Sequence, residues 1–465
     1  MRECLNPAWI RASLKIFYAL ATSFFIDPAL YDQHEAMEQS VDEPFSVLPV
    51  ELRSIIYGLC QKEDLKNLSL CNKWLRDDVV PLMWKNVCVK WATLSKFTPQ
   101  KRTSSMSFIS HLTFSRWFAG IRELRDYISY GFAFFLQCCN HYKLTSIVFK
   151  DSIPSGALRL IGEMLPNLQY LELHMLEADW VDLQQLPTTL QSLIIRYCSD
   201  FREEDWAVIW KMKQLQILEL IDYGTRSSVR LPSASEFKLN NLVKLNLLRT
   251  GKMNTLLMKI ASTCTRLEDL TISDRRSDAS ADVVTDSDVM VIAQQLKSLK
   301  RLTLYQCGRV TNASIVFLSI FSSLEELVIN CCNCDELDAS CLRYIGRMKS
   351  LKELYIIEPR YIEPTDEDFA HLGNLTSLKT LVLCYFPHLT DASLEVIGTL
   401  KCMVNLNISN CTGFTDEGLV HLAALPHLRK LVCNYEDGDY EEIMKITLAG
   451  LNLYGLSQYL VDEIE

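Results

Sequence analysis

A six-residue pattern with leucine or another apolar residue at its first, fourth and sixth positions recurs through most of this 465-residue chain. Successive starts of the clear copies are separated by 22 to 32 residues, most often by 25. One copy is too short to bury its own apolar side chains, so the period predicts a stack of repeats that share one core. The clear copies are LQYLEL at Leu168, LQSLII at Leu190, LQILEL at Leu215, LVKLNL at Leu242, LEDLTI at Leu267, LKRLTL at Leu299, LEELVI at Leu324, LKELYI at Leu351, LKTLVL at Leu378, MVNLNI at Met403 and LRKLVC at Leu428; LTSIVF at Leu144 and ISHLTF at Ile109 are weaker.

Each repeat is expected to contribute one short strand to a concave face and a return segment to the convex side. The segments SLEVIGTL, after Ala392, and GLVHLAAL, after Glu417, place apolar residues three and four apart, which is typical of helices. The predicted fold is therefore an α/β solenoid of the horseshoe type.

The cysteines fit the same repeats. The chain has 17 cysteines, an odd number, which favours reduced thiols that pack as small apolar groups. Cysteine follows the last apolar strand position by three residues in four repeats, and phenylalanine takes this place in a fifth: Cys198, Cys307, Cys332, Cys411 and Phe386. We expect these side chains to be buried.

The stretch NCCNCDELDASC at residues 330–341 also resembles a metal site, because it holds four cysteines. Cys331 and Cys334 form one Cys-x-x-Cys pair, but no second pair and no histidine lies nearby. Cys332 occupies one of the repeat positions that we expect to be buried, and Cys341 belongs to the following helix, so neither is expected to be a metal ligand. We therefore expect neither a metal nor another cofactor, and the sequence contains no catalytic motif or phosphate-binding glycine loop.

The turns after several strands share one form, as in CGRVTNASI, FPHLTDASL and CTGFTDEGL. Thr311, Thr390 and Thr415 are predicted to be helix N-caps, and Asp391, Asp416 and Glu417 suit the positive first turn of a helix. This is the pattern of the cysteine-containing leucine-rich repeats, and it resembles the repeat domain of F-box proteins.

Residues 45–88 resemble an F-box. The family motif comprises five ordered elements, and all five occur here: Leu48-Pro49, Ile55-Ile56, Asp64-Leu65, Cys71-Asn72-Lys73-Trp74 and Pro81-Leu82-Met83-Trp84. The apolar spacing predicts three short helices, although Gly58 weakens the first by about 1 kcal/mol relative to alanine. Asn72 replaces a basic residue that is usual in the family.

Together the two segments resemble the F-box/leucine-rich-repeat family of substrate receptors in SCF-type cullin-RING ubiquitin ligases. The resemblance implies that the F-box docks on a Skp-type adaptor, and through it on cullin and RING subunits. It implies that the repeats bind a protein substrate for ubiquitination and proteasomal degradation, and that the chain itself is not an enzyme. Carried onto this sequence, the adaptor contacts are Phe45, Leu48, Pro49, Ile55, Asp64, Leu65, Cys71, Trp74 and Trp84. For Leu65, Cys71 and Trp74, packing inside the three helices is an equally good explanation.

Substrate would bind to large side chains on the strands or on the loops after them. The candidates are Arg196, Tyr197, Tyr223, Arg249, Tyr305, Arg360 and Tyr385, since tyrosine and arginine contribute disproportionately to interfaces. Charge alternates from repeat to repeat, with Lys300-Arg301 followed by Glu325-Glu326 and Lys352-Glu353. This alternation and a formal net charge of −10 argue against a nucleic-acid partner.

The expected organisation has five parts: an N-terminal segment at 1–42 with little order, the F-box at 43–90, a connector at 91–142 with an atypical first repeat, the solenoid at 143–435, and a C-terminal cap with an acidic tail at 436–465. We expect a cytoplasmic or nuclear protein with no membrane partner. Residues 16–26, an apolar run after Arg11 and Lys15, resemble part of a signal peptide, whereas a start at Met37 would remove them. Two alternatives therefore remain, a repeat scaffold or inhibitor outside ubiquitin ligation and a secreted repeat protein.

Overall fold

The computed structural model describes residues 85–90, 106, 108–115, 132–133, 135–139, 142–150, 157–174, 180–196, 207–221, 237, 239–248, 253–273, 284–330, 337–357 and 362–433. The chain divides into two compact units, Met1–Met83 and Trp84–Glu465, and all described residues belong to the second. The five F-box elements lie outside the described residues.

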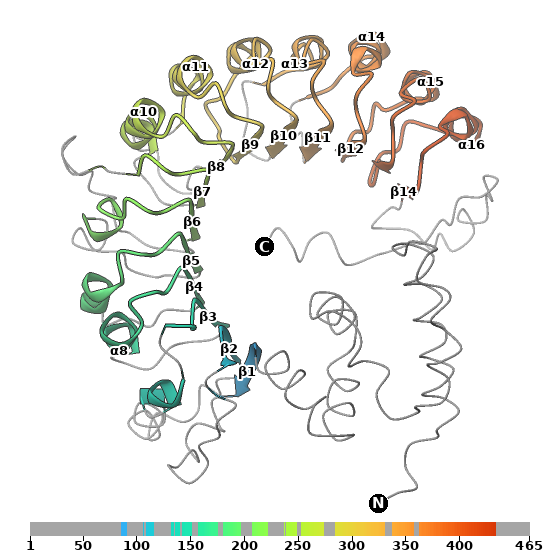
Figure 1. The fold of residues 1–465 in the computed structure, drawn as a ribbon. Helices are drawn as coiled ribbons and strands as arrows, with labels where there is room; N and C mark the ends of the chain where they lie inside the picture. The colour runs from blue at the N-terminus through green and yellow to red at the C-terminus, as the bar shows by residue number, and fades with distance from the viewer. Residues whose placement is uncertain are drawn as a thin grey trace, which may run out of the picture. The chain divides into compact units, whose positions relative to one another are not determined.

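The repeat unit is built on one sheet of fourteen parallel strands, whose order in space is their order in the chain. In Figure 1 the strands line the inner side of the curved array and the helices line its outer side, as a solenoid of leucine-rich repeats requires. The strands are β1 (Asn86–Lys90), β2 (His111–Ser115), β3 (Ser146–Phe149), β4 (Tyr170–His174), β5 (Ser192–Arg196), β6 (Ile217–Ile221), β7 (Lys244–Leu248), β8 (Asp269–Ser273), β9 (Arg301–Tyr305), β10 (Glu326–Asn330), β11 (Glu353–Ile357), β12 (Thr380–Cys384), β13 (Asn405–Asn407) and β14 (Lys430–Val432).

The sheet extends upstream of residue 143, where the sequence placed the start of the solenoid. β1 lies in the last residues assigned to the F-box, and β2 coincides with the weak copy ISHLTF in the predicted connector. The two strands pair in register from Asn86 with His111 to Lys90 with Ser115.

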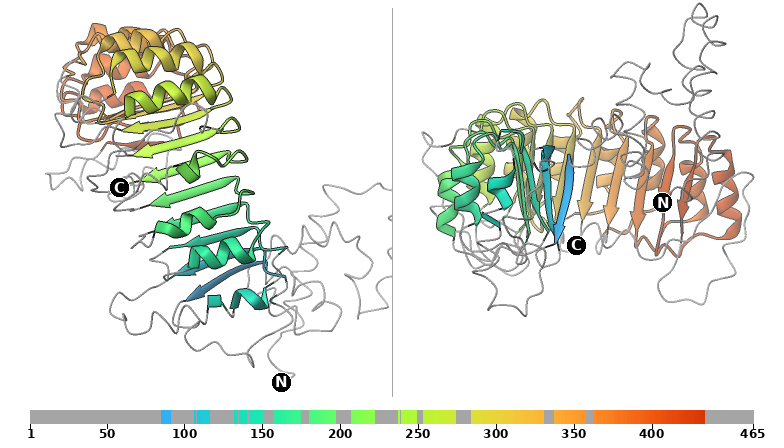
Figure 2. Two further views of the ribbon diagram at one scale, coloured as in Figure 1. Left: turned by 90° about the vertical axis from the view of Figure 1, so that its left-hand side faces the viewer. Right: turned by 60° about the horizontal axis from the view of Figure 1, so that its bottom comes forward.

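The return segments carry short helices on one side of the sheet (Figure 2). The α-helices are α8 (Ala157–Met164), α10 (Met253–Thr263), α11 (Asp286–Gln295), α12 (Asn312–Leu318), α13 (Cys341–Ile345), α14 (Asp366–Ala370), α15 (Asp391–Ile397) and α16 (Asp416–Leu419). The 3₁₀ helices are η5 (Trp180–Gln185), η6 (His371–Asn374) and η7 (Val420–Ala424).

Of the two return segments predicted as helices, SLEVIGTL contains α15 from Ser393 onward, whereas GLVHLAAL contains the end of α16 followed by the 3₁₀ helix η7. η7 ends before Leu425, which is extended at φ −88° and ψ 103°, because Pro426 follows it and a residue before proline avoids the helical region.

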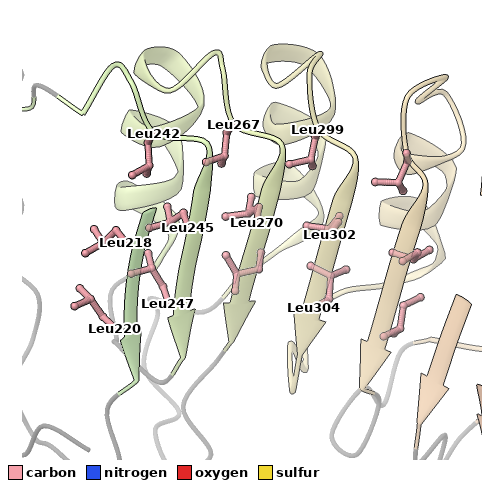
Figure 3. Close-up of a cluster of buried hydrophobic side chains, with 14 of the residues drawn as sticks. Leu218, Leu220, Leu242, Leu245, Leu247, Leu267, Leu270, Leu299, Leu302 and Leu304 are labelled. Carbon is pink, nitrogen blue, oxygen red and sulfur yellow. The ribbon is translucent and has the colours of Figure 1, made fainter. Parts of the chain in front are cut away.

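The core consists of leucine rows that run from repeat to repeat. Figure 3 shows Leu242, Leu245 and Leu247 of one repeat beside Leu267 and Leu270 of the next, all directed toward the helices. These five side chains are at most 1% exposed. Each row is continuous, so a repeat buries its leucines only with neighbours on both sides.

The predicted cysteine positions are buried wherever the structure describes them. Cys307, Cys411 and Phe386 are all in the core. The Cys411 thiol donates to the Leu383 carbonyl of the preceding repeat at 3.1 Å. Cys198, Cys331, Cys332 and Cys334 lie outside the described residues, while Cys341 is buried in α13.

The three threonines predicted as N-caps occupy the N-cap positions, but their hydroxyls mainly link neighbouring repeats. Only Thr311 caps its own helix with its side chain, accepting from the Ala313 N–H at 3.0 Å. The hydroxyls donate to an aspartate in the first turn of the preceding helix. These bonds are Thr311 to Asp286 at 2.8 Å, Thr390 to Asp366 at 2.6 Å and Thr415 to Asp391 at 2.7 Å. The predicted N-cap positions of Thr390 and Thr415 are therefore confirmed, but the hydroxyls of these two residues bond to the preceding repeat and not to their own helices.

Asp286 shows how strongly such a link is built. It accepts hydrogen bonds from the backbone and hydroxyl groups of both Thr311 and Ser314. Burial alone would raise its pKa, but the Ser314 and Thr311 hydrogen bonds outweigh burial and hold that pKa below its usual value.

A glycine permits close approach of repeats at the end of α15. A Cβ added to Gly398 would lie 2.6 Å from the backbone oxygen of His421 in the next repeat. At Gly373 the nearest atom would instead be a Val396 methyl at 3.2 Å.

We expect Asp286→Asn to lower the free energy of unfolding by about 2 kcal/mol at pH 7, because hydrogen bonds to a carboxylate are stronger than those to an amide. The depressed pKa stabilises the fold above the unfolded carboxyl pKa of about 4, and this contribution is lost as pH falls through the folded pKa. The difference from the parent protein should therefore shrink below about pH 4. Urea unfolding at pH 7 and below about pH 4 measures this difference in the free energy of unfolding. Asp416→Asn is the control, since Asp416 has the same first-turn position in α16 without such a link in the described structure; equal losses in both variants would contradict the role of the link.

Gly398→Ala should destabilise the protein by about 1–3 kcal/mol, because the new methyl group meets backbone rather than a movable side chain. Gly373→Ala should cost less than about 1 kcal/mol, since a side-chain methyl can shift. Thermal unfolding of both variants tests the contrast, and a Gly398→Ala protein as stable as the parent would refute the tight contact.

Burial raises the pKa of Cys264, Cys341 and Cys411 to about 12 in each case, whereas Cys402 is exposed. Iodoacetamide at pH 8 should modify Cys402 in the native protein at least about tenfold faster than these three thiols, because the thiolate is the reactive form. Mass spectrometry of the alkylated peptides gives the rates. Similar rates before denaturation would show that the three cysteines are not held in the core.

Candidate protein-binding surface

The side of the sheet opposite the helices is formed by the alternate strand residues that do not enter the core. We call the outward side chains of β4 to β13 the strand face. Its first row, in register from strand to strand, is Tyr170, Ser192, Ile217, Lys244, Asp269, Arg301, Glu326, Glu353, Thr380 and Asn405. Its second row is Glu172, Ile194, Glu219, Asn246, Thr271, Thr303, Val328, Tyr355, Val382 and Asn407.

A polar cluster around Glu172 begins the charged part of this face. The Tyr170 hydroxyl donates to Glu172 at 2.7 Å, and the His174 Nε2 lies 2.8 Å from the other carboxylate oxygen. The Arg196 Nε lies 3.5 Å from the same oxygen. Hydrogen bonding from His174 is the largest effect that lowers the pKa of Glu172, to about 2, against the opposing effect of burial.

The chain of charges continues across β6 to β9. Glu219, whose side chain is 9% exposed, lies between Arg196 at 3.5 Å and Lys244 at 2.8 Å. Lys244 also approaches Asp269 at 4.0 Å, and the Arg301 Nε lies 3.1 Å from Asp269. A nearly buried carboxylate such as Glu219 requires opposite charges beside it, and both neighbouring strands supply one.

This alternation of sign extends to Glu326 on β10 and ends at β11. Glu326 and Glu353 occupy adjacent, paired positions of the first row. Burial, followed by the negative charges of Glu353 and Asp269, raises the pKa of Glu326. The strand face therefore has a charge-balanced part on β4 to β9 and a carboxylate pair on β10 and β11.

A further row of charged residues lies just before the strands, and we call it the flanking row: Glu268, Lys300, Glu325 and Lys352. Its members form ion pairs with one another. Lys300 lies 2.9 Å from Glu268, and Lys352 lies 2.9 Å from Glu325. The sign alternation that the sequence showed in LEDL, LKRL, LEEL and LKEL thus becomes two parallel rows of charge on the sheet.

Three of the predicted substrate-binding residues are described. Arg196 and Tyr305 end β5 and β9, with three strands between them, and Tyr385 follows β12 and is 40% exposed. At about 4.8 Å per strand, Arg196 and Tyr305 are roughly 19 Å apart along the sheet, so these residues do not form one compact site. Tyr385, Gln306 and Asn410 have positive φ angles of 65°, 56° and 58°. Each of them directly precedes a buried Cys or Phe position.

The other predicted site residues lie outside the described part of the chain. These are Tyr197, Tyr223, Arg249 and Arg360 of the substrate set, and Phe45, Leu48, Pro49, Ile55, Asp64, Leu65, Cys71, Trp74 and Trp84 of the adaptor set.

The sequence interpretation missed the main charged residues of the strand face. Glu172 and Glu219 each stand between the two strand leucines, in LQYLEL and LQILEL. That position always faces away from the core, because side chains alternate along a strand. Reading it down the repeats would have located both carboxylates.

The described residues also bear on metal binding and membrane insertion. Within the described ranges, no three or more His, Cys, Asp or Glu side chains are grouped so that they could hold a metal ion. No helix in the same ranges has the length and apolar character needed to cross a bilayer.

No family model matches the sequence. The chain is 26% identical over 284 residues to a Caenorhabditis elegans protein, EEED8.10, provisionally named as RNA-binding; the match covers 59% of this chain and 37% of that protein. It is 25% identical over 176 residues to the Mus musculus F-box/LRR-repeat protein 12, covering 37% and 50%, and 24% identical over 332 residues to the Bos taurus F-box/LRR-repeat protein 4, covering 69% and 44%. The chain thus spans half or less of the length of these curated relatives.

Two solved structures share a weak likeness. An internalin from Listeria monocytogenes is 18% identical with a TM-score of 0.41, and the match covers 72% of this chain and 82% of that one. Rad7, from its complex with Elc1 in yeast, is 18% identical with a TM-score of 0.42, covering 92% and 98%. TM-scores this low decide nothing about function.

The fold is instead evident from the molecule itself. The 25-residue period, the fourteen parallel strands and the buried leucine rows are those of leucine-rich repeats, and two of the distant relatives carry that repeat in their names. The repeat unit of this chain is a leucine-rich-repeat solenoid.

Proposed function

We propose that this chain is a substrate-recognition subunit of an SCF-type ubiquitin ligase. The observation that carries the proposal is the order of segments along the chain. All five F-box elements lie between Leu48 and Trp84, and the leucine-rich-repeat sheet begins at once with β1 at Asn86. The relatives named F-box/LRR-repeat proteins support the same combination.

In this proposal the two units divide the work. The F-box binds a Skp-type adaptor, which connects it to cullin and RING subunits, and the strand face binds a protein substrate. The chain performs no chemistry of its own, since ubiquitin transfer belongs to the other subunits. We propose a cytoplasmic or nuclear location, where such ligases and reduced cysteines are found together.

We propose a protein rather than a nucleic acid as the ligand of the strand face, although one relative is named for RNA binding. From β4 to β11 the charged residues of its first two rows, with Arg196, comprise five carboxylates and three cations. They are Glu172, Glu219, Asp269, Glu326 and Glu353 against Arg196, Lys244 and Arg301. A polyanion is repelled by such a face, because phosphate binding depends on clustered lysine and arginine.

Adaptor co-purification tests the proposal. We expect the intact chain to recover the Skp-type adaptor and cullin, and Leu48→Ala/Pro49→Ala to recover at least about tenfold less adaptor. Losing one buried leucine contact alone removes about 2 kcal/mol of binding free energy, which exceeds a tenfold change.

The control is Tyr305→Ala/Tyr385→Ala, which alters the strand side of the repeat unit and should leave adaptor recovery unchanged. Circular dichroism of each variant confirms that the repeats remain folded. Adaptor missing from the intact chain as well would refute the ligase role, and a scaffold or inhibitor built on the same repeats would then be the better interpretation.

A further inference from the structure

The strand face carries one interruption in an otherwise ordered pattern of charges. Along the first row Lys244, Asp269 and Arg301 alternate in sign on successive strands, and Glu326 continues the alternation. The next strand should then supply a cation, but it supplies Glu353. The positions that follow are the uncharged Thr380 and Asn405, so this row of the described strands holds no cation until Lys430 on β14.

Two cations close to the pair are already engaged by other carboxylates. The Arg301 Nε is held by Asp269 at 3.1 Å, on the side away from Glu353. Lys352, the nearest cation of the flanking row, is held by Glu325 at 2.9 Å. Among the described residues, the side-chain donor to Glu353 is neutral, the Tyr355 hydroxyl at 2.8 Å.

The environment of Glu326 shows the consequence. This side chain forms no ion pair within 4.0 Å among the described residues, although it is partly buried. Burial, followed by the negative charges of Glu353 and Asp269, raises its pKa, and the more distant positive charges of Arg301 and Lys244 offset this only in part.

Three largely apolar side chains lie beside the carboxylate pair in the second row of the strand face. Val328 and Val382 flank Tyr355 in the second row, on β10, β12 and β11, and all three are half-buried. A ligand group that lies across this part of the face would therefore meet two carboxylates at one edge, and a ring with two branched aliphatic side chains beside them.

We propose that Glu326 and Glu353, with Val328, Tyr355 and Val382, form a docking site for an arginine of a partner protein that is flanked by apolar residues. The inference rests on the proposed function, because it assigns the chemistry of the substrate segment that the strand face receives. Charge complementarity selects a cation, which would restore the alternation along the first row.

Arginine fits this site better than lysine. The carboxylates are on strands about 4.8 Å apart, and the planar guanidinium can donate in two directions at once, toward both carboxylates. Its flat face can also stack on the Tyr355 ring, a contact that an ammonium group makes less extensively. Because Val328, Tyr355 and Val382 lie beside the carboxylates, we expect apolar residues next to the arginine in the partner segment.

The test is selection of peptides from a random twelve-residue phage library on the immobilised full-length protein. Enriched sequences should contain arginine next to valine, leucine, isoleucine or an aromatic residue. A synthetic peptide of an enriched sequence is then measured by fluorescence polarisation, together with a copy in which citrulline, the neutral isostere, replaces that arginine.

We expect Glu326→Gln/Glu353→Gln to weaken the arginine peptide by at least about tenfold, as removal of one side of a partly buried charge pair does. The citrulline peptide should be equally weak on the parent protein, and should lose nothing further on the variant, since the two changes remove the same interaction. The matched control, Glu367→Gln/Glu395→Gln, removes two exposed carboxylates from the helix side, on α14 and α15, and should bind the arginine peptide as the parent does.

Weaker peptide binding by Glu326→Gln/Glu353→Gln cannot be ascribed to unfolding of the variant. Glu326→Gln removes repulsion between two carboxylates, so the double variant should unfold at the same temperature as the parent or higher. Peptides without a basic residue, or equal binding by the two double variants, would overturn the proposal. Adaptor recovery is measured separately: intact adaptor binding without an arginine preference refutes only the docking site, whereas an arginine preference without adaptor refutes only the ligase role.

Discussion

The shared burial of leucine between neighbouring repeats is the constraint from which the rest of this structure follows. Leu242, Leu245 and Leu247 can leave water only if similar side chains lie above and below them, so the repeats must stack in register. Register then fixes what the opposite side of the sheet presents. Every residue between two strand leucines is brought to that face, and residues 25 positions apart in the chain become direct neighbours.

This constraint also explains which features of the fold and of the strand face could be predicted from the sequence. Leucine spacing identifies the strands, and the positions of Cys307, Phe386 and Cys411 are confirmed, because burial in a repeat depends on local pattern. The N-cap positions of Thr390 and Thr415 follow from the sequence as well, but the bonds of their hydroxyls to Asp366 and Asp391 do not, since those bonds depend on distances between repeats. The charge pairs of Glu219 likewise require the register of three strands, which the spacing implies only when the outward positions are aligned.

The strand face shows two different uses of charge on one surface. Glu219 and Asp269 each meet cations from both neighbouring strands, which satisfies a buried charge and leaves little for a ligand to gain. Around Glu326 and Glu353 the same arrangement is incomplete. Specificity for a partner can thus be placed in a few strands of a long sheet, while the remaining strands maintain the fold.

The aspartate links of the helix side have a mechanical consequence. Asp286, Asp366 and Asp391 each bond to the next repeat along the chain, as the strands also do. Tension applied to the two ends of the stack would load these junctions in series rather than in parallel. The array should therefore stretch as a spring whose compliance is spread over many junctions, and it should yield at its weakest junction while the repeats beyond it stay assembled.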